Sequence, residues 1–173
     1  ILQMNALIKV LKQDFNIDAQ ALQFDKNYDF LGREVKAKYE ISIKSFGIYL
    51  KYLRERGLKI FLFNVKKKKL FEDFKKRENL IGGFYTDYKD LDAVIIGSDE
   101  VFALHTGPTP AFFGHALPTN KVFAYAGCFG PTTIGDIKKL HCEAFVGSGL
   151  NSMKGLAMRD QNSIQIAKEL TGR

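Results

Sequence analysis

Three short apolar runs, each ended by glycine or a charged residue, constrain the fold of this chain most. The runs cover residues 93–96, 122–126 and 156–158. Helical apolar spacing separates the second run from the third and also follows the third. Continuously apolar runs of this length are typical of strands covered on both faces. Strands that alternate with helices indicate a parallel sheet with crossover helices, so we expect an α/β fold.

The chain opens inside a predicted helix. Apolar residues recur at helical spacing from Ile1 to Phe15, and no Ser, Thr, Asp or Asn cap precedes them. We therefore expect that an upstream strand and turn are missing. A short strand is predicted within residues 17–24, and an irregular polar connection over residues 25–39.

Residues 33–79 carry the positive charge of the chain. They hold 15 basic and 6 acidic residues, a net +9, whereas the rest holds 11 basic and 13 acidic residues, a net −2. Helices are predicted over residues 41–56 and 66–78, with a stop at Gly57, and residues 58–65 fit strand or helix. Three apolar side chains of the charged helix are expected to face the core: Leu70, Phe71 and Phe74.

Composition excludes several classes of protein. An apolar share of 46%, with 15 Phe and 7 Tyr, excludes a chain that is disordered throughout. No apolar run approaches the roughly 20 residues of a membrane span, and no signal-peptide pattern opens the chain. Cys128 and Cys142 lack zinc spacing, and no histidine pair has metal-binding spacing, so no metal is expected. The glycine patterns of ATPases and dinucleotide-binding enzymes are also absent, which disfavours both classes. We expect a single domain over residues 1–173, with reduced cysteines and a cytoplasmic location.

The three runs end in residues that suit ligand binding. In open parallel sheets, ligands bind at the carboxyl ends of the strands. Glycines such as Gly97 and Gly130, with Ser98, allow the backbone to approach a ligand closely. Arg159 can hold a phosphate or carboxylate through two hydrogen bonds. Its structural alternative is a salt bridge to an acidic neighbour.

The acidic residues and histidines at these ends have open alternatives. Asp99 suits a proton donor or an acceptor of a sugar hydroxyl, or it hydrogen-bonds the backbone of a turn. Asp160 is placed to cap the following helix. His105 is the histidine nearest to Asp99 in the sequence, and its alternative is a structural role.

These strand ends resemble the polysaccharide pyruvyl transferase family. The resemblance rests on residues 92–102, 124–130 and 156–160, with Ser163 and residues 169–172 after them. It implies a Rossmann-like domain that forms one half of a GT-B-like, two-domain enzyme with its active site between the halves. On this resemblance, the chain is expected to correspond to the N-terminal half and to be inactive alone.

The resemblance also implies the chemistry. Members transfer the enolpyruvyl unit of phosphoenolpyruvate to a sugar hydroxyl and form a pyruvate ketal in cell-surface polysaccharide. It implies that Arg159 binds this donor, with no separate cofactor, and that the acceptor is a saccharide or lipid-linked oligosaccharide. Asp99 is the catalytic candidate, the backbone at Gly97, Ser98 and Gly130 binds substrate, and His105 and Tyr125 are further candidates. The chain departs from the family pattern at four positions. Glu100 and Phe102 stand where the family commonly has Gln and Trp, and Cys128 and Ala157 each stand where it has Ser.

Two other functions stay open. One is a non-catalytic relative that binds a sugar phosphate. The other is a basic module that binds nucleic acid or an anionic membrane through Lys66–Lys69, with peripheral contact at the inner membrane face. The structural alternative for that run is a solvated helix face with its phenylalanines turned inward. We favour this alternative over nucleic-acid binding, so no nucleic-acid partner is expected.

Overall fold

The computed structural model describes residues 2–27, 30–31, 44–105 and 109–173, with the side chains of α3 described from residue 54 onward. The chain divides into two compact units. Unit 1 comprises Ile1–Ala21 and Glu40–Gly82, and unit 2 comprises Leu22–Tyr39 and Gly83–Arg173. Most of the expected polar connection and the expected helix start at residue 41 lie outside the described residues.

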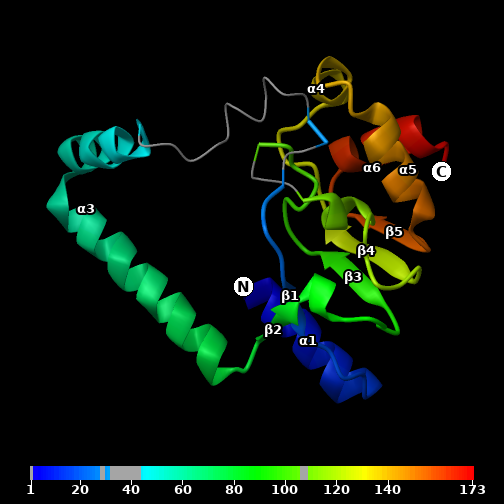
Figure 1. The fold of residues 1–173 in the computed structure, drawn as a ribbon, viewed down its shortest axis with the longest axis horizontal. Coiled ribbons are helices and arrows are strands. Elements are labelled where there is room, and N and C mark those ends of the chain that lie inside the picture. Colours follow the sequence, from blue (N-terminus) through cyan, green and yellow to red (C-terminus); the bar gives the residue numbers. More distant parts are fainter. Residues whose placement is uncertain (1, 28–29, 32–43, 106–108) are drawn as a thin grey trace. The chain divides into compact units, whose positions relative to one another are not determined.

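Unit 2 is built on a three-stranded parallel sheet of order β3-β4-β5 (Figure 1). Its strands are β3 (Val94–Gly97), β4 (Val122–Gly127) and β5 (Gly155–Met158). The short helix η2 (Pro110–Phe113) lies between β3 and β4 in the sequence. The helices α4 (Ile134–Lys139) and α5 (Glu143–Ser152) join β4 to β5, and α6 (Gln161–Thr171) follows β5. The α/β class with a Rossmann-like parallel sheet is confirmed.

The core of unit 2 lies against one face of this sheet. Val122 and Ala124 of β4 point into a buried cluster with Val146 and Leu150 of α5. Aromatic rings fill the middle of the cluster, and the Phe102 ring centroid lies 5.3 Å from that of Phe129 and 5.7 Å from that of Phe113. Such contacts stabilise a core beyond the burial of apolar area alone.

Phe30 and Leu31 also belong to this core, although they fall in the expected polar connection. Leu31 is buried, and the Phe30 ring stacks on Phe145 with the two centroids 4.4 Å apart. Two apolar residues in a polar stretch carry no periodicity, so the sequence pattern gave no reason to place them inside.

The other face of the sheet is open in the described structure. Ile95, Phe123 and Tyr125 are 40%, 38% and 52% exposed, so the expectation of strands covered on both faces is wrong here. The strand order follows the chain order, and right-handed crossovers then place every connection on the same face.

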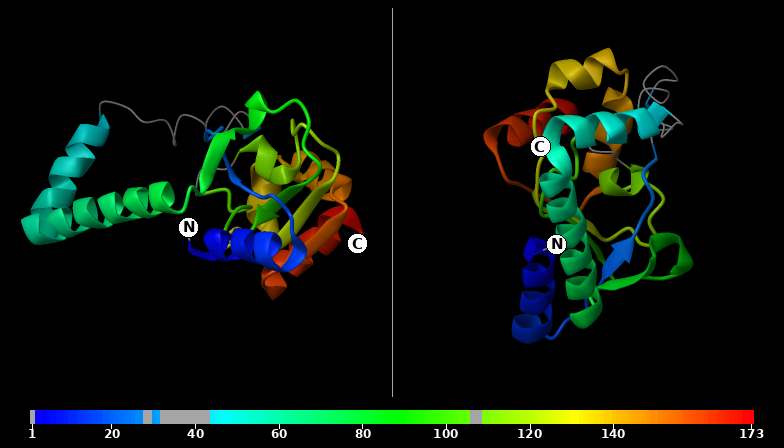
Figure 2. Two further views of the ribbon diagram at one scale, coloured as in Figure 1. Left: turned by 90° about the horizontal axis from the view of Figure 1, so that it is seen from below. Right: turned by 90° about the vertical axis from the view of Figure 1, so that its left-hand side faces the viewer.

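Unit 1 is mainly helical (Figures 1 and 2). It contains α1 (Leu2–Phe15) and α3 (Lys44–Arg77). Gly57 interrupts α3 with φ 77° and ψ 161°, a conformation that favours glycine, so α3 consists of two helical segments. The break at Gly57 is as expected, residues 58–65 are helical, and Leu70 is 69% exposed, against expectation.

Short elements complete the fold. β1 (Ala21–Gln23) and β2 (Ile81–Phe84) form a two-stranded sheet, and η1 (Tyr85–Asp87) follows β2. The strand expected within residues 17–24 is therefore confirmed over three residues only. Among the described residues, no helix is both long and apolar enough to cross a membrane.

Candidate active site

Asp99 and Arg159 meet at the carboxyl ends of β3 and β5. Both terminal nitrogens of Arg159, Nη1 and Nη2, lie 3.5 Å from Asp99 Oδ1. The two residues are 60 positions apart in the sequence. Parallel strands that end at one edge of a sheet bring them together, as the positions of the three apolar runs indicate.

Cys128, at the end of the central strand, holds Arg159 from a second direction. A register shift after Tyr125 pairs Gly127 with Met158, so the residues that follow them, Cys128 and Arg159, are adjacent. Arg159 Nη2 donates to Cys128 Sγ at 3.0 Å, and Arg159 N donates to Gly127 O at 3.1 Å. The hydrogen bond to Cys128, and then the Asp99 carboxylate, raise the pKa of Arg159, so the guanidinium stays charged.

Asp160 fixes the start of α6 beside this cluster. Its Oδ1 accepts a hydrogen bond from Ser163 N at 2.8 Å, which makes it the expected N-cap. Burial favours the neutral acid, but the hydrogen bonds from Ser163 and from the Cys128 thiol, with the charge of Arg159, outweigh it and lower the pKa of Asp160. Ser163 Oγ in turn accepts from Phe129 N at 2.9 Å. The buried Ser163 therefore ties the end of β4 to α6.

Gly97 and Gly130 lie where another segment of the chain leaves no space for a side chain. Gly97 has φ 153°, and a Cβ there would run into the backbone carbonyl of Tyr125 in β4. Gly130 has φ 55°, and its Cβ would come 2.9 Å from Glu100 Cδ. Ser98 is half-buried and follows Gly97 through a cis peptide bond. Close approach at both glycines is thus between segments of this protein, and their contact with a substrate stays a prediction.

The two further candidates have other neighbours. His105 Nε2 lies 4.0 Å from Glu100 Oε2. Tyr125 lies within β4, paired in register with Gly97 and Ala157, on the exposed face of the sheet.

The ion pair between Asp99 and Arg159 is exposed and long. The Asp99 side chain is 75% exposed and that of Arg159 is 39% exposed, and their separation of 3.5 Å is long for a charged hydrogen bond. Exposed pairs of this kind contribute little to stability. A guanidinium in such a pair has the geometry to bind another carboxylate or a phosphate.

Comparison with protein families identifies the chain. A family model described as polysaccharide pyruvyl transferase matches residues 1–172. The chain belongs to this family. No curated protein and no solved structure matches it. The family name points to a polysaccharide as the acceptor.

Two departures from the pattern expected for this family contact other candidate site residues. Cys128 stands where a serine is expected, and its sulfur accepts the hydrogen bond from Arg159. Glu100 stands where a glutamine is expected, and its side chain packs on Gly130. The sequence marked both positions as departures, but it gave no sign that either side chain contacts Arg159 or Gly130.

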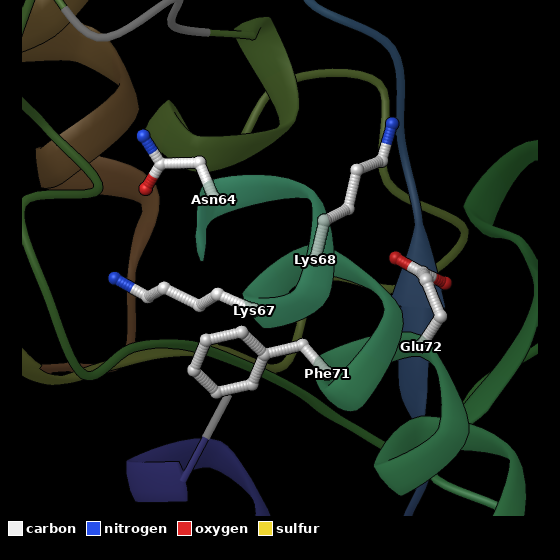
Figure 3. Close-up of a pocket in the computed structure, with 5 residues that line it drawn as sticks. All are labelled: Asn64, Lys67, Lys68, Phe71 and Glu72. Atoms are coloured by element: carbon white, nitrogen blue, oxygen red, sulfur yellow. The ribbon is translucent and has the colours of Figure 1, made fainter. Parts of the chain in front are cut away.

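No metal-binding group is formed by the part of the chain that the structure describes, counting sets of three or more His, Cys, Asp or Glu. An open hollow is present on α3, lined by Asn64, Lys67, Lys68, Phe71 and Glu72 (Figure 3). It belongs to unit 1 and shares no residue with the cluster around Arg159.

Proposed function

We propose that the carboxyl ends of β3, β4 and β5 bind phosphoenolpyruvate for transfer of its enolpyruvyl unit to a saccharide hydroxyl. The observation that carries this proposal is the state of Arg159. Its guanidinium is charged, partly exposed, held by Cys128 and only loosely paired with Asp99. A planar guanidinium in this state suits the carboxylate or phosphate of the donor.

Binding of the donor to Arg159 in place of Asp99 also gives Asp99 a role. When the donor takes its place at Arg159, the Asp99 carboxylate becomes available to accept the proton of an attacking sugar hydroxyl. The sugar oxygen bonds to C2 of the donor, a proton adds to the C3 methylene, and the C2–O bond to phosphate breaks. A second hydroxyl of the same acceptor closes the ketal. One hydroxyl proton ends on the new methyl group and the other on the released phosphate.

The two-domain architecture is part of this proposal and rests on the resemblance. A second Rossmann-like half would supply further basic residues, including histidine, to the donor. On that basis, the 173 residues alone are expected to bind phosphoenolpyruvate without releasing phosphate in the presence of acceptor. Phosphate release by these residues alone would contradict the two-domain proposal.

Donor binding to single-residue variants tests the site. We expect Arg159→Ala to weaken phosphoenolpyruvate binding at least about tenfold in isothermal titration, because a charge-assisted pair is lost. Arg159→Lys should recover only part of the loss, since lysine lacks the two-pronged geometry. Arg77→Lys, on the exposed end of α3, is the matched control and should bind as wild type. Equal binding by wild type and Arg159→Ala would refute the site.

Asp99→Asn separates binding from catalysis. Removal of the competing carboxylate should leave donor affinity unchanged or make it stronger, because Arg159 is then free for the donor. In the complete enzyme, the same change should abolish phosphate release, since the amide cannot accept the hydroxyl proton. Weaker donor binding with normal turnover would contradict the role of Asp99.

A non-catalytic relative is the second candidate, and the departures at Cys128 and Glu100 favour it. It predicts donor binding that depends on Arg159, but no phosphate release from the complete protein with saccharide acceptors.

A further inference from the structure

One stretch of α3 exposes six apolar side chains. Residues 58–65 span just over two helical turns, and six of them are exposed apolar residues: Leu58, Ile60, Phe61, Leu62, Phe63 and Val65. At about 100° per residue, four of them, spaced i, i+3, i+4 and i+7, share one face of the helix: Leu58, Phe61, Leu62 and Val65. Phe61 and Phe63 are both exposed, which contradicts the alternative that they turn inward.

The same stretch is strongly basic. Over residues 54–71, seven basic residues stand against one acidic residue, a net +6. The basic residues are Arg54, Arg56, Lys59 and the run Lys66–Lys69, and all are exposed. We refer to residues 54–71 as the basic apolar segment.

The hollow on α3 shows how charge and apolar surface combine (Figure 3). Lys67 and Lys68 extend away from each other, and Lys67 Nζ lies 6.0 Å from the centroid of the Phe71 ring. Glu72 at the edge of the hollow pairs with Lys75 at 2.6 Å, and this hydrogen bond lowers the pKa of Glu72. Lys75 is thus the hydrogen-bond partner of Glu72, and Lys68 of the run also lowers the pKa of this carboxyl. One acidic neighbour leaves the four lysines of the run with an excess of positive charge.

We propose that the basic apolar segment docks on a lipid bilayer with anionic headgroups. Phenylalanine and leucine enter the boundary of headgroups and acyl chains, while lysines gain energy from the negative surface. Nucleic acid would use the positive charge and stack on Phe61 or Phe63, but it leaves the aliphatic residues at positions 58, 60, 62 and 65 without a function. The proposal does not depend on the donor site in unit 2.

Vesicle flotation with the full chain tests the charge. Vesicles of phosphatidylcholine with phosphatidylglycerol are compared with vesicles of phosphatidylcholine alone. We expect binding to the anionic vesicles only, and a loss of at least about tenfold when Lys66–Lys69 are all changed to Gln. The matched control changes four exposed lysines of unit 2 to Gln, with the same change in net charge: Lys121, Lys139, Lys154 and Lys168. This control should bind as wild type.

A second measurement reports on the apolar side chains directly. The chain contains no tryptophan, so Phe61→Trp introduces a single fluorophore on the apolar face, at a position that is 38% exposed. Its emission should shift to the blue with anionic vesicles, because the ring enters a less polar environment. Phe123→Trp, on β4 of unit 2, should not shift.

Three results would overturn the proposal. One is an equal loss of vesicle binding in both lysine variants, which would show that binding depends only on the net charge of the chain. Another is an unshifted Phe61→Trp emission in a protein that floats with the vesicles. The third is tight binding to single-stranded RNA that Lys66–Lys69→Gln abolishes, with no binding to anionic vesicles, which would assign the segment to nucleic acid. Circular dichroism of each variant confirms that it is folded.

Discussion

Cys142 couples the stability of unit 2 to alkaline pH. The side chain is 1% exposed, and burial raises the pKa of its thiol from 9.0 to about 11. The folded protein therefore keeps this proton where the unfolded chain loses it. The contribution of the neutral thiol is complete below about pH 9 and is lost as the pH rises towards about 11.

The expected result is a pH dependence that disappears with the thiol. Between about pH 8 and pH 10, the free energy of unfolding should fall by about 1 kcal/mol more in wild type than in Cys142→Ala. Urea unfolding at the two pH values measures this difference. Because other groups titrate in both proteins, only the difference between them is assigned to Cys142. Parallel pH profiles would show that Cys142 is not the group responsible.

Cys128 is expected to position Arg159 for the donor. In Cys128→Ala, Arg159 loses the hydrogen bond at 3.0 Å that holds it, so phosphoenolpyruvate affinity should fall severalfold. Cys128→Ser keeps a hydrogen-bond donor and acceptor at this position and should restore the affinity for phosphoenolpyruvate. Titration of both variants, together with their melting temperatures, separates positioning from stability. Equal affinity in the alanine and serine variants would contradict this role.

At the residue scale, the sequence predicts which strand ends meet but not which side chains touch. The meeting of Asp99 and Arg159 follows from parallel strands that end at one edge of a sheet. The contact of Arg159 with Cys128 depends on the register shift after Tyr125, and that of Glu100 with Gly130 depends on a local turn. Neither the shift nor the turn leaves a periodic pattern in the sequence.

The α6 helix depends on its N-cap residue, Asp160. Asp160→Ala removes the acceptor for Ser163 N and should lower the free energy of unfolding by about 1 kcal/mol. Asp160→Asn is the control and should stay within a few tenths of a kcal/mol of wild type, because asparagine also caps well. Urea unfolding near neutral pH measures both. A loss as large in Asp160→Asn as in Asp160→Ala would indicate that the charge beside Arg159 matters, and not the cap.

At the element scale, periodicity predicts helices and strands better than it predicts burial. The three apolar runs are strands, and Gly57 breaks α3 as a glycine in this conformation should. The exposure of Ile95 and Leu70 was not predicted. An apolar residue in a strand or helix shows that a face could be covered, but only the arrangement of the neighbouring elements decides whether it is.

The two units differ in how much apolar surface they bury. Among the described residues of unit 1, only Leu80 is a buried apolar residue, whereas unit 2 contains the large buried cluster. Local opening is easiest where few apolar contacts are broken. We therefore expect the stability to be unevenly distributed along the chain.

Hydrogen exchange followed by mass spectrometry measures this distribution. Amides of α3 over residues 58–77 should exchange at least about tenfold faster than those of β4, which is hydrogen-bonded to strands on both sides. Uniform protection would contradict this expectation. The same measurement separates the two proposals, because each assigns its ligand to a different unit. Phosphoenolpyruvate should slow exchange at the ends of β3, β4 and β5 and leave α3 unchanged, whereas anionic vesicles should slow exchange in α3 alone.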